Sequence, residues 1–149
     1  MAADVLDCAC FNTRKAARAL TQLYDDMLRP SGLRSTQFTL LMILRGRGPM
    51  SINGLAEATV TDRTTLSRNL AILEERGLVR IQPGEDARVR VVELTDAGDE
   101  AASAAYPLWQ KAQALVGKRM GEERLGRLLA DLSRAVGAAT EGQRGAVVT

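Results

Sequence analysis

A run of hydroxyl and guanidinium side chains in the middle of the chain has the chemistry to bind nucleic acid. Hydroxyls reach phosphates and base edges, and a guanidinium can contact guanine through two parallel hydrogen bonds. The run consists of Thr61, Arg63, Thr64, Thr65, Ser67 and Arg68. On a helix, much of this run lies roughly opposite Leu66, Leu70 and Leu73, so one face is buried and the other is polar and partly basic. The same pattern also fits an ordinary solvated helix face.

A second group of arginines follows a turn-rich segment. Residues 79–81 and 89–92 are rich in β-branched side chains, which predicts a hairpin around the intervening turn. Arg88 and Arg90 come just after its tip, where a guanidinium could enter the narrow minor groove of DNA. Asp86 could orient Arg88 through a charge-assisted hydrogen bond. The alternative is an exposed edge strand that its charges protect against aggregation.

Helical segments with clear stops precede these residues. Asp7 can cap a first long helix, which residues 29–32 end with a proline and a glycine. Ser35 can cap a second helix, which breaks at residues 46–49.

Two short helices come next in close order. Ser51 caps one that ends near Ala58, and Thr61 starts another that runs to Gly77. Two short helices joined by two or three residues have the layout of a helix-turn-helix, whose second helix enters the DNA major groove. The hairpin that follows would then form a wing.

The chain carries more helix than a winged module needs. Thr95 opens a long helix through about Val116, which Pro107 should kink or interrupt, and another helix follows. The apolar stripes outside the module are Leu20, Leu23, Met27, Leu115, Leu125, Leu128, Leu129 and Leu132. Packing of two chains across a two-fold axis would cover them and set two recognition helices about 34–36 Å apart. Burial within a monomer is the alternative.

Composition narrows the classes of function. The chain has no histidine, two cysteines and a net charge of +2. It lacks the usual general base, a Gly-rich phosphate loop and a paired-carboxylate motif, so we expect neither an enzyme nor a cofactor. No apolar stretch is long enough to cross a bilayer, and the residues from Met1 onward lack a secretory signal. A cytoplasmic protein without membrane contact is expected.

Segments 51–56, 62–70 and 73–79 resemble the core of the MarR (multiple antibiotic resistance regulator) family of winged-helix transcription regulators. Segment 86–98 follows the wing pattern of that family, which is Asp-x-Arg, a strand, then Leu-Thr-x-x-Gly. The resemblance implies a homodimer whose first and last two helices form the subunit contact. Its two winged modules would read a pseudo-palindromic double-stranded DNA, with Arg88 as the wing arginine.

The resemblance also implies that small effectors bind between the dimer helices and the winged module. Candidates for this pocket are Phe11, Arg14, Tyr24, Tyr106 and Trp109. Core and interface packing is the alternative for these side chains. Cys8 and Cys10 suggest redox or thiophilic-metal sensing, against the alternative of two inert packed thiols.

The sequence therefore predicts a mainly α-helical chain with a small β-hairpin wing, in the α+β class, as one domain over residues 1–149. Residues 34–94 form the winged helix-turn-helix module, and residues 7–30 and 95–138 form dimerisation helices. The expected function is dimeric, sequence-specific DNA binding in transcription regulation, with repression favoured over activation and a small ligand or cysteine oxidation as modulator. A winged helix that binds another protein instead of specific DNA is the alternative.

Overall fold

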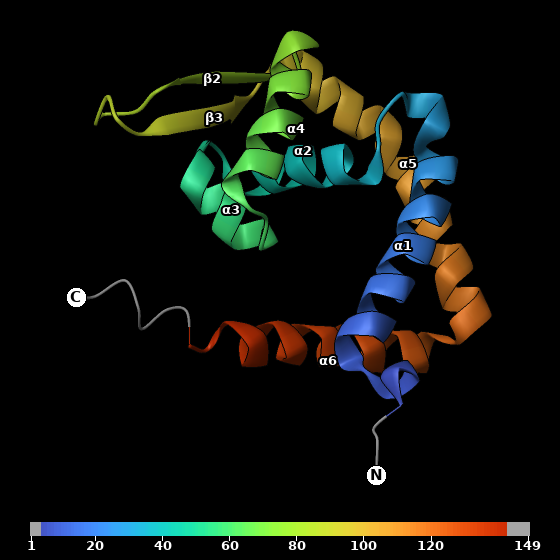
Figure 1. The fold of residues 1–149 in the computed structure, drawn as a ribbon. Helices are drawn as coiled ribbons and strands as arrows, with labels where there is room; N and C mark the ends of the chain where they lie inside the picture. The colour runs from blue at the N-terminus through green and yellow to red at the C-terminus, as the bar shows by residue number, and fades with distance from the viewer. Residues whose placement is uncertain (1–3, 143–149) are drawn as a thin grey trace. The chain divides into compact units, whose positions relative to one another are not determined.

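The computed structural model describes residues 4–142 (Figure 1). Two parts of the predictions, the start of the chain at residues 1–3 and the end of the predicted domain at residues 143–149, lie outside the described residues. The chain divides into two compact units between Gln110 and Lys111, and each is described by itself.

The described residues are mainly helical with one small sheet, as predicted. In chain order the elements are η1 (Val5–Asp7), α1 (Ala9–Leu28), η2 (Arg29–Ser31), α2 (Ser35–Arg47), β1 (Met50–Ser51), α3 (Ile52–Thr59), α4 (Arg63–Glu75), β2 (Val79–Pro83), β3 (Arg90–Leu94), α5 (Asp96–Met120) and α6 (Glu122–Thr140). Here η1 and η2 are single 3₁₀ turns. Helix α5 continues through Pro107, so of the two outcomes predicted there the interruption is wrong, while a kink stays a prediction.

The sheet is antiparallel with strand order β1-β3-β2. The predicted hairpin is β2 and β3, which pair from Val79 with Leu94 to Pro83 with Arg90. The short strand β1 was not predicted, and it pairs with the other edge of β3 through Met50 with Val92 and Ser51 with Val91. The hairpin extends away from the helices of its unit (Figure 1).

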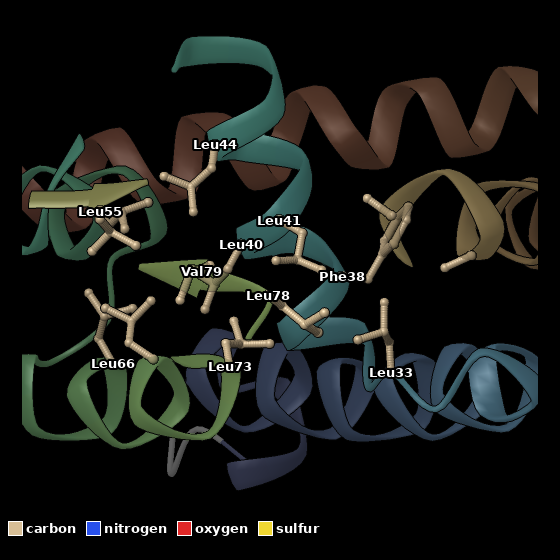
Figure 2. Packing of buried hydrophobic residues seen from close by; sticks show 14 of the residues in the cluster. Leu33, Phe38, Leu40, Leu41, Leu44, Leu55, Leu66, Leu73, Leu78 and Val79 are labelled. Carbon is tan, nitrogen blue, oxygen red and sulfur yellow. The ribbon is translucent and has the colours of Figure 1, made fainter. Parts of the chain in front are cut away.

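One leucine-rich core holds the first unit together (Figure 2). Side chains from the end of α1, from α2, α3, α4, β2 and β3, and from the first part of α5 meet there. Its most deeply buried large members are Leu28, Leu41, Leu44, Leu55, Leu66, Leu70, Leu73 and Val92. At roughly 2 kcal/mol for each fully buried leucine, this cluster is the main favourable contribution to the stability of the unit.

Two of the predicted helix caps are wrong. Asp7 belongs to η1, and Asp4 caps that turn by accepting the Leu6 N–H at 3.0 Å. Ser35 is the first residue of α2, and its N–H donates to Asp25 of α1 at 2.7 Å. The N-cap residues are Cys8 for α1 and Arg34 for α2, so each predicted cap lies one residue away from the residue that takes this place. Ser51 does cap α3 as predicted, accepting the Gly54 N–H at 3.0 Å.

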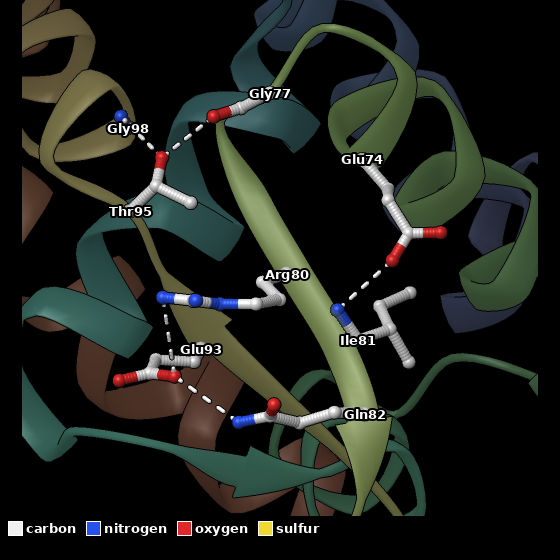
Figure 3. Close-up of polar contacts among 8 residues, drawn as sticks. All are labelled: Glu74, Gly77, Arg80, Ile81, Gln82, Glu93, Thr95 and Gly98. Carbon is white, nitrogen blue, oxygen red and sulfur yellow. Dashed lines mark hydrogen bonds and ion pairs between the residues drawn. The ribbon is translucent and has the colours of Figure 1, made fainter.

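The start of α5 is fastened to the end of α4. The Thr95 hydroxyl donates to the Gly77 carbonyl at 2.6 Å and accepts the Gly98 N–H at 3.0 Å (Figure 3). A Cβ on Gly98 would lie 2.0 Å from the Leu78 carbonyl oxygen, which is backbone and cannot swing away. Only glycine allows α5 to approach this closely.

Gly98→Ala should therefore destabilise the protein by about 1–3 kcal/mol, because either α5 or the Leu78 carbonyl must shift. Gly46→Ala is the matched control, since Gly46 lies in α2 with no atom within 4 Å of an added Cβ. That control should gain up to about 1 kcal/mol from helix propensity. Denaturant unfolding measures both, and equal stabilities for the two variants would contradict the close approach.

Candidate nucleic-acid interface

Helix α4 presents the predicted polar face to solvent. Leu66 is 1% exposed and Leu70 and Leu73 are fully buried, so these three side chains fix the rotation of the helix. The exposed residues of the predicted run on α4 are Arg63, Thr64, Thr65, Ser67 and Arg68. This surface offers hydroxyl and guanidinium groups free of the core.

The N-terminus of α4 differs from the prediction at one residue. Thr61 does not start the helix. It lies before the cap, half-buried, with its hydroxyl donating to the Thr59 carbonyl at 3.3 Å. Asp62 is the cap, and its carboxylate accepts the Thr65 N–H at 2.9 Å. A carboxylate suits the positive end of a helix better than a hydroxyl does, so Asp62 takes this place.

The same contact perturbs the titration of the capping residue. The pKa of Asp62 lies below its ordinary value, first because of the hydrogen bond from the backbone N–H of Thr65 and then because of the Thr65 side chain. The charged form of Asp62 therefore stabilises the start of α4.

The turn between α3 and α4 holds an unusual residue that the sequence did not single out. Val60 has a φ of 50°, in the left-handed region that a β-branched side chain rarely adopts. Its side chain is 62% exposed. Two backbone hydrogen bonds close the turn: the Val60 N–H donates to the Glu57 carbonyl at 3.3 Å, and the Thr61 N–H donates to the Ala56 carbonyl at 3.0 Å. The short connection of a helix-turn-helix is thus present, at the cost of one strained residue.

The hairpin tip holds its arginine as the sequence predicted. Asp86 accepts the Arg88 backbone N–H at 3.0 Å, the guanidinium Nε at 3.2 Å and Nη2 at 3.3 Å. The pKa of Asp86 is lowered by these bonds, the backbone bond being the larger cause. The Arg88 side chain is nonetheless 91% exposed, and Arg90 is also exposed. Asp86 therefore restricts the directions in which Arg88 can point without covering it.

Side chains at the root of the hairpin make contacts that sequence reasoning missed. Glu93 on β3 faces Arg80 at 3.8 Å and Gln82 at 3.4 Å, both on β2. On the other side of β2, Glu74 of α4 accepts the Ile81 N–H at 2.9 Å (Figure 3). A glutamate in the last turn of a helix is the one sequence signal that could have indicated this bond, because the helix dipole disfavours an anion there.

The effector candidates fall into separate places. Tyr106 and Trp109 stack with ring centroids 5.6 Å apart, and Phe38 of α2 stacks on Trp109 at 6.1 Å. A hollow of about 290 Å³ is lined by Phe38, Thr39, Met42, Ile43, Tyr106 and Trp109. Phe11, Arg14 and Tyr24 lie on α1 and do not line it. Burial raises the pKa of Tyr24.

Both cysteines are exposed, and neither forms a disulfide. Cys8 is the N-cap of α1 in an extended conformation, and Cys10 lies in the first turn of that helix. Their environment in a single chain is therefore solvent and not a packed core.

Residues 4–142 offer neither a membrane span nor a metal site. They contain no helix that is long and apolar enough to cross a membrane. They also contain no cluster of three or more histidine, cysteine, aspartate or glutamate side chains arranged to hold a metal ion.

Comparison with known proteins places this geometry in a family. The model of the MarR family matches residues 31–88. The HTH-type transcriptional repressor NicR of Pseudomonas putida is 35% identical over 95 residues, which cover 63% of this chain and 60% of NicR. The transcriptional regulator HosA of Escherichia coli is 34% identical over 100 residues, covering 66% of this chain and 68% of HosA. The chain thus spans about three fifths of NicR and two thirds of HosA.

A solved structure is similar over more of the chain. The transcriptional regulator MosR of M. tuberculosis, in complex with DNA, superposes with a TM-score of 0.78 and 43% identity. The match covers 89% of this chain and 98% of that one.

The capping role of Asp62 gives a pH-dependent prediction. A carboxylate whose pKa is lowered by folding stabilises the fold above its unfolded pKa, and this contribution is lost as the pH falls through the folded pKa. Asp62→Ala should therefore unfold more easily than the wild type above about pH 5, and the difference should shrink below about pH 4. Denaturant unfolding at several pH values measures the difference.

Ser51→Ala is the control, because it removes a neutral cap from α3. Its cost of about 1 kcal/mol should not change over the same pH range. If the difference in unfolding free energy between Asp62→Ala and the wild type stayed constant as the pH fell below about 4, the charge of Asp62 would have no part in capping.

Proposed function

The chain belongs to the MarR family, and we propose that it is a homodimeric, sequence-specific DNA-binding transcription regulator, acting as a repressor in the cytoplasm. The observation that carries the proposal is the exposed hydroxyl and guanidinium face of α4 beside an arginine-tipped hairpin. A helix with short polar side chains fits the major groove, which is about 12 Å wide, and an arginine-tipped ribbon fits the neighbouring minor groove.

Residues of α4 take different roles in this proposal. Arg68 lies on the exposed face, one helical turn after Thr64, where it can reach a base edge. Thr64, Thr65 and Ser67 have hydroxyls for phosphates or base edges, and the free amides at the start of the helix favour phosphate. Arg88 and Arg90 of the wing would add positive charge over the adjacent backbone or groove.

Helix α6 supports a dimer. Leu125, Leu128, Leu129, Leu132 and Val136 recur at helical spacing along one side of it. Leu129 is 51% exposed and Val136 is 47% exposed in the single chain. The opposite side carries ion pairs between Glu123 and Arg127 and between Asp131 and Arg134. A second copy of the chain would bury the apolar side and leave the charged side in water.

A modulating signal has two possible points of entry in this proposal. The hollow beside Tyr106 and Trp109 is apolar with few polar groups, which suits a small aromatic ligand. The exposed thiols of Cys8 and Cys10 are open to oxidants. Either event would act by changing the spacing of the two recognition helices.

DNA binding should depend on salt and on named arginines. Selection from duplexes with a random core of about 30 base pairs, long enough for two half-sites, should yield a pseudo-palindromic sequence. The logarithm of the affinity for this sequence should fall linearly with the logarithm of the salt concentration. Arg68→Ala should cost about 1–3 kcal/mol and relax base preference if Arg68 reads a base, whereas a uniform loss would make it a phosphate contact.

Arg127→Ala on α6 is the charge-matched control and should leave sequence preference unchanged. No duplex binding even at low salt would overturn the proposal and favour the alternative, a winged helix that binds another protein.

The dimer has its own test. Leu129→Asp should give particles of about one chain mass, because an uncompensated carboxylate would be buried in the apolar contact. Ala130→Asp adds the same charge one residue along, away from the apolar side, and should stay dimeric. Sedimentation or light scattering measures the mass. A wild-type monomer, or a Leu129→Asp protein that stays dimeric, would rule out α6 as the contact.

A further inference from the structure

The carboxylate of Glu74 lies at a position that the helix dipole disfavours, and one hydrogen bond explains why it is there. It lies in the last turn of α4, where the negative end of the helix dipole disfavours an anion. Its Oε2 accepts the backbone N–H of Ile81 at 2.9 Å, so a helix side chain binds the strand that begins four residues after the helix ends (Figure 3). Glu75, its neighbour in the same turn, makes no such bond within residues 4–142.

The Ile81 amide belongs to the free edge of the sheet. Because β3 lies between β1 and β2, one side of β2 faces no other strand of the described residues. Amides alternate along an antiparallel strand, so the N–H groups of residues 79, 81 and 83 share the side that faces away from β3. Pro83 has no N–H. Glu74 therefore holds the middle amide of this edge, and through it the edge is attached to α4.

This bond is one of two hydrogen bonds that, together with the packing of the shared core, join α4 to the segment 78–81. The first is at the turn, where the Leu78 N–H donates to the Leu73 carbonyl at 2.9 Å. Pairing with β3 holds β2 in the sheet, and a second hydrogen bond three residues beyond the first restrains the direction of the hairpin relative to α4. From Leu78 to the tip is roughly 25 Å at 3.3 Å per residue, so a pivot of roughly 10° about the turn would move the tip by about 4 Å. That displacement is enough to break a hydrogen bond at the tip.

We propose that Glu74 is a positioning residue for DNA binding, which sets the direction of the wing relative to α4 and so brings Arg88 to the duplex while α4 lies in its groove. The inference rests on the proposed function. Glu74 itself touches no DNA in this arrangement. The competing explanation is that Glu74 only seals an exposed strand edge, which protects against aggregation and has no effect on Arg88.

The first measurement does not need DNA. Amide hydrogen exchange of the full-length protein should show faster exchange at Ile81 in Glu74→Ala than in the wild type. Glu75→Ala is the matched control, because it removes the same charge from the same helical turn, and it should leave Ile81 unchanged. Glu74→Gln keeps an acceptor oxygen and should retain most of the protection. Unchanged exchange at Ile81 in Glu74→Ala would overturn the inference.

The second measurement asks whether Glu74 and Arg88 act together on DNA. The probe is the duplex selected by the wild-type protein, and the variants are Glu74→Ala, Arg88→Ala and their combination. Arg88→Ala should weaken DNA binding about tenfold when it is introduced into the wild-type protein, and by the same factor when it is introduced into the Glu75→Ala variant. In Glu74→Ala the same substitution should have little further effect, because the wing is already misdirected. Glu74→Gln should restore the sensitivity to Arg88→Ala.

The sign of the single substitution is also informative. Loss of a negative charge near DNA by itself tightens binding, so Glu75→Ala should bind as well as the wild type or better. Glu74→Ala should bind more weakly. Tighter binding by Glu74→Ala, or an undiminished effect of Arg88→Ala in that background, would leave Glu74 with an edge-sealing role only. A wild-type protein that binds no duplex would overturn the proposed function, while exchange at Ile81 would still report on the attachment.

Discussion

The burial of Leu66, Leu70 and Leu73 on one side of α4 fixes which side chains that helix presents to solvent. Rotation by one residue is 100°, which would expose leucine and bury polar or charged groups. Each leucine brought into water costs roughly 2 kcal/mol, and a buried unpaired guanidinium costs more. The helix therefore has one rotational setting, and the positions of Arg68, of the Asp62 cap and of the bond from Glu74 all depend on it.

Three carboxylates organise a surface whose proposed partner is an anion. Asp62 holds the start of α4, Glu74 joins the end of α4 to β2, and Asp86 restrains the tip of the hairpin. Each accepts a backbone N–H, so each fixes the main chain and not only a side chain. The net charge of the chain is only +2. Attraction for DNA therefore has to come from arginines held in chosen places, and acidic residues supply part of that placement.

Much of the fold can be predicted from local sequence patterns. The leucine spacing of α4, the Ser51 cap of α3 and the β-branched strands of the hairpin each follow from residues close in sequence, and the structure confirms them. The errors have a common cause. The N-cap of α4 is Asp62 instead of Thr61, and that of α1 is Cys8 instead of Asp7, because the path of the backbone decides at which residue a helix begins.

Contacts between residues far apart in the sequence could not be predicted, because no local sequence pattern indicates them. The strand β1 has two residues and exists only because β3 lies beside it. The partner of Trp109 across the hollow is Phe38, from a helix about seventy residues earlier in the chain, while Phe11, Arg14 and Tyr24, chosen for being on flanking helices, lie elsewhere. The bond from Glu74 to Ile81 crosses a turn, so its geometry follows from the tertiary packing of α4 and not from spacing.

Strand β3 pairs with both β1 and β2 at Val91 and Val92 and with β2 alone at its other residues, so the middle of β3 is the part held from both sides. Toward the tip from Val91, the two arms of the hairpin are joined by the pair of Pro83 with Arg90 and by the Gly84 N–H, which donates to the Val89 carbonyl at 2.8 Å. Residues 85–88, which include Asp86 and Arg88, lie beyond that bond, so they can bend without breaking the pairing of the strands. The tip of the hairpin can therefore follow variations in the width of the DNA groove while the helices at its base stay in place.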